Sequence, residues 1–304
     1  MTQFFRVIKV PLDASTETED LGTKVKFWFH DPELGLCLFK KIRPNTGEDW
    51  SEKIVSELCE LLNLPHANYE LATFNDERGI ISPSFIPDNG SLFLGNELLS
   101  QVVSDYPQDE DSPSQHTVAQ VVETLNGSSL GLPRNWTPPD GITDAVEVFI
   151  GYLLLDAWIG NTDRHHENWG VIRLEGHTYL APTYDHASSL GRTLQDQERQ
   201  NRLKTKDKGY SVQAYVEKGT SCLYSEARDA KPLKIYDAFC HAAKLCPNAA
   251  NVWVDKLSEI SVDRTLALFQ RVPGERMSPT AIEFAQQILQ INQNRLLEFK
   301  SQLQ

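Results

Sequence analysis

The chain lacks three features that would place it in a familiar class at once. No apolar run reaches the 18 residues that a membrane-spanning helix requires. The N-terminus, MTQFFRVIKV, lacks the cationic start and small-residue cleavage site of a secretory signal. Positive charge is also scarce, because 29 Lys and Arg stand against 42 Asp and Glu, a formal net charge of -13. We therefore predict a cytoplasmic protein with no membrane contact and no direct contact with nucleic acid. Nucleic acids and anionic membrane surfaces should both repel a chain of negative net charge.

Cysteine is too scarce to form a disulfide framework. The number of cysteines is odd, and no two of them form a C-x-x-C pair. This usage is typical of reduced thiols, and we predict that most of them lie in the core. With 304 residues the chain is long enough for one large core or for two lobes. The five cysteines are Cys37, Cys59, Cys222, Cys240 and Cys246.

The first part of the chain is rich in strand patterns. Two apolar, aromatic-rich runs within 24–41 flank the turn sequence DPELG, which predicts an antiparallel hairpin. Apolar residues then recur every three to four positions, so an amphipathic helix is predicted over 51–64. Two further strands are predicted over 69–74 and 80–85.

A turn-rich stretch, Pro87-Asp88-Asn89-Gly90, is our candidate hinge, and the pattern becomes mostly helical beyond it. Thr143 is a candidate cap for a strongly apolar helix that ends near Gly160. Ser278-Pro279 is typical of a helix start and predicts a long final helix. We predict an α+β fold of two lobes, with a small antiparallel-sheet N-lobe at 1–87 and a larger helical C-lobe at 88–304.

Polar residues crowd the stretch 160–169, between the apolar helix and a predicted short hairpin. Asp163 is followed five residues later by Asn168, and Asp185 follows the hairpin. Phosphoryl transfer from a nucleotide needs a carboxylate that orients and deprotonates the acceptor hydroxyl, and oxygen ligands that hold Mg²⁺ against the phosphates. We predict Asp163 as the catalytic base and Asn168 and Asp185 as metal ligands, with ATP and Mg²⁺ as cofactors. The D-x-x-x-x-N spacing alone is weak, because Asp and Asn are also common in turns.

Two of these segments, NTDRHHENWGV and YLAPTYDHASSLG, resemble the catalytic and metal-binding segments of HipA-like serine/threonine kinases. More loosely, LCLFKKIRP, EDWSEKIVSELCELLNLP and VPGERMSP resemble the nucleotide-binding strand, first helix and C-terminal end of that family. The resemblance implies a two-lobed protein-kinase-like fold in a compact form, without the additional N-terminal subdomain of larger members. It also implies that Lys40 contacts the ATP phosphates and that Glu52 orients Lys40.

The same resemblance implies a function. The chain would be an ATP- and Mg²⁺-dependent protein serine/threonine kinase that transfers the γ-phosphoryl group to a protein hydroxyl. Known substrates in the family include aminoacyl-tRNA synthetases in toxin-antitoxin systems, so a synthetase or translation factor is the implied substrate and an antitoxin the implied partner. Two alternatives stay open. One is a phosphoinositide-type lipid kinase, whose catalytic loop is similar to Asp163-Arg164-His165 with Asn168, and the other is an inactive nucleotide-binding interaction module.

Three residues of the predicted site have a second interpretation. Lys41 competes with Lys40 for the phosphates, and both could be solvated charges at a strand end. His165 is predicted to brace the catalytic loop through backbone hydrogen bonds, although with His166 it could also ligate the metal of a phosphohydrolase. Glu52 could simply complement the dipole of its helix.

Two further stretches leave the sequence-based prediction open. No G-x-G-x-x-G motif is present, and only Leu21-Gly22-Thr23-Lys24 precedes the first hairpin strand, so how the phosphates are covered is not defined. The most basic stretch, 202–208, either attracts an acidic substrate or a phosphate, or is a solvated loop.

Overall fold

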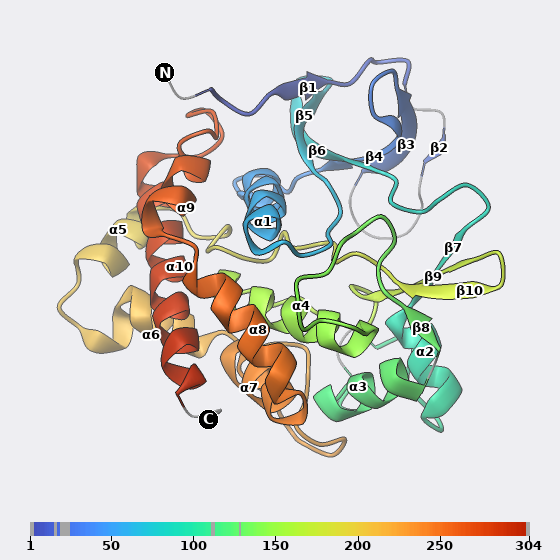
Figure 1. Cartoon of the computed structure of the whole chain (residues 1–304). Coiled ribbons are helices and arrows are strands. Elements are labelled where there is room, and N and C mark those ends of the chain that lie inside the picture. The colour runs from blue at the N-terminus through green and yellow to red at the C-terminus, as the bar shows by residue number, and fades with distance from the viewer. Residues whose placement is uncertain (1–2, 15–16, 19–24, 111–112, 128, 302–304) are drawn as a thin grey trace.

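The computed structural model describes residues 3–14, 17–18, 25–110, 113–127 and 129–301. It has a smaller lobe built on one sheet and a larger lobe of helices that also holds a second sheet (Figure 1). The predicted two-lobed α+β architecture is confirmed. The predicted boundary between 87 and 88 falls in the turn after the first sheet, and the boundary itself stays a prediction.

The N-lobe sheet has six strands in the order β1-β5-β6-β4-β3-β2, and only its β1 and β5 pair is parallel. The predicted hairpin is β3 and β4, which pair from Lys26 with Lys40 to Asp31 with Gly35. Alternate residues of β4 face opposite sides of the sheet, so Cys37 and Phe39 are buried. The strands are β1 (Val7–Lys9), β2 (Glu17–Thr18), β3 (Lys26–Asp31), β4 (Gly35–Lys41), β5 (Glu70–Phe74) and β6 (Glu77–Pro83).

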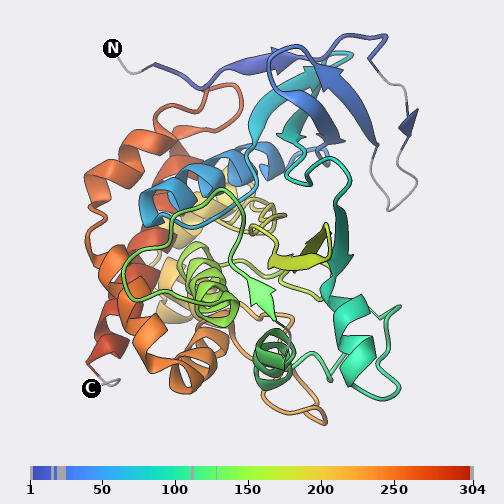
Figure 2. The same ribbon diagram turned by 45° about the vertical axis from the view of Figure 1, so that its right-hand side comes forward.

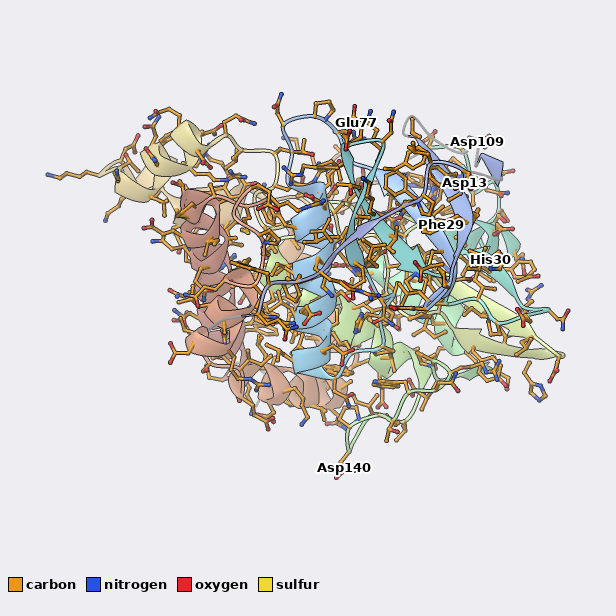
Figure 3. The ribbon with its side chains drawn as sticks, turned by 90° about the horizontal axis from the view of Figure 1, so that it is seen from above. Asp13, Phe29, His30, Glu77, Asp109 and Asp140 are labelled. Carbon is orange, nitrogen blue, oxygen red and sulfur yellow. The ribbon has the colours of Figure 1, made fainter. Side chains whose placement is uncertain are left out.

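Helix α1 (Glu48–Leu62) connects the sheet to the C-lobe and begins three residues before the predicted start. Its Ile54, Val55 and Leu58 belong to the same buried apolar cluster as the core of the C-lobe. Seen from above, α1 lies between the strands of the N-lobe and helix α10 (Figure 3). The helix therefore belongs by packing to both lobes.

The apolar helix of the C-lobe is α4 (Ala145–Ile159), and every residue except Glu147 is buried. A helix that is apolar all round must lie in the centre of its lobe. Its C-cap is Gly160 at φ 68°, as predicted, but the predicted cap Thr143 is wrong. Asp144 is the N-cap, because its carboxylate accepts the backbone N–H of Glu147 at 2.9 Å. Thr143 lies one residue earlier and donates its N–H and hydroxyl to the Glu147 side chain instead.

The second sheet has the order β7-β9-β10-β8 and carries the predicted short hairpin as β9 and β10. Ser278 caps the long final helix α10, as predicted. No described helix combines the length and apolar character needed to cross a membrane. All five cysteines are free thiols, three of them buried. The remaining elements are β7 (Ser91–Leu94), α2 (Gly95–Val102), α3 (Val118–Gly127), β8 (Leu130–Gly131), β9 (Gly170–Leu174), β10 (His177–Leu180), α5 (Asp196–Lys204), η1 (Lys208–Tyr210), α6 (Val212–Lys218), α7 (Ile235–Leu245), α8 (Pro247–Ser258), α9 (Val262–Phe269) and α10 (Pro279–Lys300).

A buried ion cluster ties the loop between α9 and α10 to the N-lobe. Asp49 is fully buried in the first turn of α1 and accepts from Arg78 on β6 and from Arg276, both at 2.7 Å. Arg276 also donates to the Ala72 carbonyl of β5 at 2.9 Å. This loop reaches up to the edge of the sheet (Figure 2). The two arginines therefore connect a C-lobe loop, a sheet and a helix through one carboxylate.

Replacing Asp49 by Asn should destabilise the protein by about 3–5 kcal/mol, because it leaves the buried Arg276 charge without its counter-ion. Urea unfolding followed by circular dichroism measures the loss. The matched control is Glu33→Gln at the exposed Arg6–Glu33 pair, whose side chains are 49% and 73% exposed. That change should cost under about 1 kcal/mol. Equal losses in the two variants would show that the cluster contributes no more than a surface pair.

Candidate active site

The loop after α4 is organised by a buried ion pair between Asp156 and Arg164. Arg164 is 1% exposed, and its Nε and one terminal nitrogen donate to the two Asp156 oxygens at 2.7 and 2.8 Å. The other terminal nitrogen donates to the Asn168 carbonyl at 2.7 Å. Asn161 completes the arrangement, because its amide donates to Asp156 and its oxygen accepts the N–H of Asp163. One guanidinium therefore fixes both ends of the Asp163 to Asn168 segment.

Asp163 and Asn168 are held close together by this loop. The Asn168 amide nitrogen donates to the Asp163 carbonyl at 2.7 Å, which turns the amide oxygen in another direction. One carboxylate oxygen of Asp163, Oδ2, accepts from the Ser188 hydroxyl at 3.1 Å. Ser188 in turn accepts from Arg192 at 2.8 Å, and Arg192 donates to the buried Glu48 at 2.8 Å. Ser188 and Arg192 thus orient Asp163, and no local pattern in the sequence marks either residue for this task.

Lys40, Glu52 and Asp185 form the second half of the site. The Lys40 ammonium lies 3.1 Å from Asp185 Oδ2. Asp185 has a left-handed backbone at φ 57°, which is unfavourable for Asp, and its N–H donates to the Tyr69 hydroxyl at 3.0 Å. Glu52 accepts the N–H of His186 at 2.9 Å. Burial, and then the charge of Asp185, raise the pKa of Glu52 to about 8, while the charge of Lys40 opposes the shift.

A cavity of about 520 Å³ opens between the lobes and contains most of the predicted residues. Lys40, His165, Asn168 and Asp185 line its polar part. The other two predicted site residues, Asp163 and Glu52, are not among its lining residues. The volume is within the range of small-molecule sites. Its apolar part, which the sequence did not predict, consists of Trp28, Leu38, Phe85, Ile86, Leu92, Leu94 and Tyr184.

The residues present are suitable for a nucleotide with Mg²⁺. Carboxylate and amide oxygens are hard ligands for that ion, and Asn168 and Asp185 supply one of each in the same cavity. Lys40 adds a cation for phosphate oxygens. The Phe85 and Tyr184 rings stack with centroids 5.4 Å apart at the apolar part, which can receive a flat base.

The residues for which the sequence left alternative roles, Lys41, His165 and His166, lie in different surroundings. Lys41 faces away from the cavity and pairs with Glu77 at 3.4 Å. His165 lines the cavity, and its Nδ1 accepts the N–H of Glu167 at 3.2 Å. His166 is buried and bonded to the Tyr106 hydroxyl at 2.9 Å, so the two neighbouring histidines do not share a direction. Within the described ranges no group of three or more His, Cys, Asp or Glu could hold a metal. The stretch Leu21-Gly22-Thr23-Lys24 lies outside the described residues.

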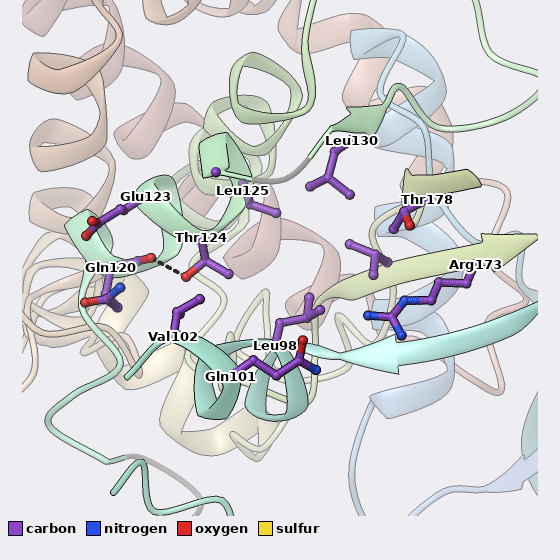
Figure 4. A pocket seen from close by; sticks show the side chains of 12 residues that line it. Leu98, Gln101, Val102, Gln120, Glu123, Thr124, Leu125, Leu130, Arg173 and Thr178 are labelled. Atoms are coloured by element: carbon purple, nitrogen blue, oxygen red, sulfur yellow. Dashed lines mark hydrogen bonds between the residues drawn. The ribbon is translucent and has the colours of Figure 1, made fainter. Parts of the chain in front are cut away.

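A separate hollow of about 330 Å³ lies between α2, α3 and the second sheet (Figure 4). Leu98 and Leu125 form its apolar part, and Glu123 and Arg173 bring charge to it. Arg173 also lies over the Phe93 ring at 4.0 Å. None of the predicted site residues lines this hollow, so the interlobe cavity is the one that matches the predicted chemistry.

Behind the loop, His116 supports Trp169 in a fully buried position. Its Nε2 accepts from the indole N–H of Trp169 at 3.1 Å, and its Nδ1 lies 3.1 Å from the Cys222 carbonyl. These contacts require a neutral ring with the proton on Nδ1. Burial, and then the neighbouring His166, lower the pKa of His116 to about 3.

The buried His116 should make stability depend on pH in the acidic range. An unfolded chain binds a proton at this histidine below about pH 6.5, while the folded chain does so only near pH 3. Stability from this group is therefore complete above pH 6.5 and declines as the pH falls, by up to about 1.4 kcal/mol per pH unit. Urea unfolding at pH 7, 6 and 5 should show that the wild type loses stability faster than His116→Gln. Parallel pH curves for the two proteins would contradict the assignment.

Comparisons with known proteins agree with this geometry at the level of the fold. No protein-family model and no curated protein sequence matches the chain. The crystal structure of the Helicobacter pylori proinflammatory kinase CtkA superposes with a TM-score of 0.71 at 17% identity, over 99% of this chain and 97% of that one. HipA of Shewanella oneidensis MR-1, solved with HipB and operator DNA, gives 0.61 at 13% identity, over 97% and 69%. The predicted HipA-like kinase fold is confirmed.

Proposed function

We propose that this chain is an ATP- and Mg²⁺-dependent protein serine/threonine kinase. The observation that carries the proposal is the interlobe cavity, where Lys40, Asn168 and Asp185 meet beside an apolar compartment and next to Asp163. A base, a phosphate-binding cation and two oxygen ligands are the parts that phosphoryl transfer uses. The kinase-like fold agrees with that assignment.

Each residue has a distinct task in this proposal. Asp163 accepts the proton of the acceptor hydroxyl through Oδ1, since Oδ2 accepts the hydrogen bond from Ser188. Asn168 and Asp185 hold Mg²⁺, which when bound offsets charge on the transferring phosphoryl group. Lys40 binds the phosphates, and Glu52 holds the backbone next to Asp185 by accepting the His186 N–H. The hydroxyl oxygen bonds to the γ-phosphorus, and ADP leaves with the former bridging oxygen.

The apolar part of the cavity would hold the base of the nucleotide. Leu38 lies two residues before Lys40 on β4, so both side chains face the same side of the strand. That spacing places an apolar surface for the base and a cation for the phosphates on one strand. Tyr184, which precedes Asp185, is anchored through its hydroxyl to the Glu167 carbonyl at 2.7 Å.

We propose a protein as the acceptor, of the translation-factor or aminoacyl-tRNA synthetase class, and an antitoxin-like protein as a partner. The solved HipA is in a complex with HipB and operator DNA, which supports the search for such a partner. With a net charge of -13 this chain is poorly suited to contact the DNA itself.

Replacing Asp163 by Asn should reduce phosphate transfer by about 10²- to 10⁴-fold, because the acceptor loses its base. Transfer from γ-labelled ATP to proteins of a cell extract measures the loss. The thermal shift caused by Mg-ATP should remain, since Asp163 does not line the nucleotide cavity. Undiminished transfer by the variant would disprove the role of Asp163.

The same assays separate the alternatives. A wild-type chain that is stabilised by Mg-ATP but transfers phosphate to no acceptor would be the nucleotide-binding module. Co-sedimentation with vesicles of anionic lipids, together with phosphate transfer to phosphoinositides, would favour the lipid kinase.

Replacing Lys40 by Met should weaken Mg-ATP binding more than tenfold, because the phosphates lose their cation and Asp185 its ion pair. Lys41→Met is a matched control, since Lys41 is the next residue on the strand and pairs with Glu77 outside the cavity. Thermal shift against ATP concentration at fixed Mg²⁺ gives both affinities. If the two variants bind equally, Lys40 is not the phosphate-binding lysine.

A further inference from the structure

A cavity of about 300 Å³ adjoins the start of the loop that carries Asp163. It is distinct from the hollow between α2 and α3, and we call it the second cavity. Gly160 and Thr162 line this second cavity, whereas His165 and Asn168 line the interlobe cavity. Thr162 immediately precedes Asp163 in the chain. The second cavity therefore lies next to the proposed base and draws its lining from other residues than the nucleotide site.

Thr162, which lines the second cavity, is hydrogen-bonded to Ser188, the residue that orients Asp163. The backbone N–H and the hydroxyl of Thr162 donate to the Ser188 carbonyl at 3.1 and 3.2 Å. The Ser188 side chain in turn donates to Asp163. A group held in the second cavity thus has a fixed position relative to the Asp163 carboxylate.

The floor of the second cavity is apolar. It is formed by Ile159 at the end of α4, Leu190, Ile235 at the start of α7 and Ile288 on α10. All four side chains are less than 9% exposed, so they present a preformed surface rather than one that must be built on binding. This floor can take an aliphatic side chain, which a phosphate or a sugar would not need.

One exposed lysine lines the second cavity, and two others lie close to it. Lys218 lines it, and the Lys218 ammonium donates to the Gly209 carbonyl at 3.2 Å, beside Lys208. Lys234 donates to the Lys218 carbonyl at 2.9 Å. Among the described residues, none of these three exposed lysines has a carboxylate within 4.0 Å. We call Lys208, Lys218 and Lys234 the lysine rim.

Arg202 is a cation of the same cavity whose charge is compensated by a carboxylate. It also lines the second cavity, but it pairs with Glu198 at 2.9 Å and lies over the Tyr210 ring at 4.3 Å. The lysine rim, in contrast to Arg202, has no carboxylate partner among the described residues. Its charge is therefore available to an acidic ligand.

We propose that the second cavity is the docking site of the acceptor protein and selects a segment that combines an aliphatic side chain with acidic residues. The aliphatic side chain enters the floor, the acidic residues contact the lysine rim, and the neighbouring serine or threonine reaches Asp163. This inference rests on the proposed kinase function. It adds a substrate class: acceptor hydroxyls in acidic sequence with an adjacent aliphatic residue.

Binding of fluorescent peptides, measured by anisotropy without ATP, tests the inference separately from catalysis. The acidic probe is a ten-residue peptide with one serine, an adjacent leucine and acidic residues elsewhere. Matched probes carry lysines in place of the acidic residues, or asparagine in place of the leucine. The acidic probe should bind at least tenfold more tightly than the basic one and about fivefold more tightly than the asparagine one.

Charge reversal at the lysine rim provides the variants. Lys218→Glu and Lys234→Glu should each weaken binding of the acidic probe about fivefold, because each removes one cation and adds a like charge. The matched control is Lys244→Glu, an exposed lysine on the same α7 helix but about 14 Å further along it from Ile235. It should leave binding unchanged. All three variants should keep the Mg-ATP thermal shift of the wild type.

The outcomes distinguish the two proposals. Selective binding of the acidic probe, with phosphate transferred neither to that probe nor to any protein of a cell extract, would contradict the kinase function and retain the docking site. Phosphorylation of proteins with equal binding of the acidic and basic probes would overturn the docking site and retain the kinase. A single-stranded RNA ten-mer that binds more tightly than the acidic probe, and loses binding in Lys218→Glu, would make the rim a nucleic-acid site and overturn the inference.

Discussion

The site depends on a guanidinium that has been removed from water. Arg164 is buried, and such a charge is costly unless every donor finds an acceptor. Asp156 and the Asn168 carbonyl supply those acceptors, so the loop can adopt only a conformation that brings its two ends to one side chain. Buried ion pairs contribute little net stability, but a planar, forked donor specifies geometry well. Precision of the loop, rather than stability of the protein, is the physical reason for the pair.

The first turn of α1 extends this constraint to the N-lobe. Glu48 and Asp49 are both buried there, close to the positive end of the helix dipole, and each is bonded to arginines from distant parts of the chain. Through Arg192 and Ser188, Glu48 is connected to the Asp163 carboxylate. One turn later, Glu52 holds the backbone of His186, next to Asp185. The relative position of the lobes and the orientation of both acidic site residues are therefore linked through the first two turns of α1.

Local patterns explain what the sequence could predict. The β3 and β4 hairpin, helix α1 and the start of α10 depend on alternation, helical periodicity and capping residues that lie within a few positions of one another. The choice between Thr143 and Asp144 as cap was beyond that resolution, because both are good capping residues and the hydrogen bond decides. Residues 160–169 were recognisable as a candidate site because their polar side chains follow one another within one short stretch of sequence.

What the sequence could not reveal is carried by contacts between distant segments. Ser188 reaches Asp163 across 25 positions, and Arg276 reaches Asp49 across 227. Lys40 and Lys41 are indistinguishable as residue types, and only the structure shows that Lys40 lines the cavity while Lys41 pairs with Glu77. The apolar residues around Leu38 and Tyr184 come from both lobes, so no single window of sequence contains the compartment.

Lys40 and Asp185 compensate each other's charge in the interlobe cavity by forming an ion pair. Burial raises the pKa of Glu52 and so disfavours its charged form, whereas Lys40 and Asp185 form an ion pair beside it. In the proposed kinase, Asp185 would exchange Lys40 for a divalent cation, and Lys40 would then be available to a phosphate. The ion pair neutralises both groups in this structure, and in the proposed kinase the same two groups would bind the metal and the nucleotide phosphates.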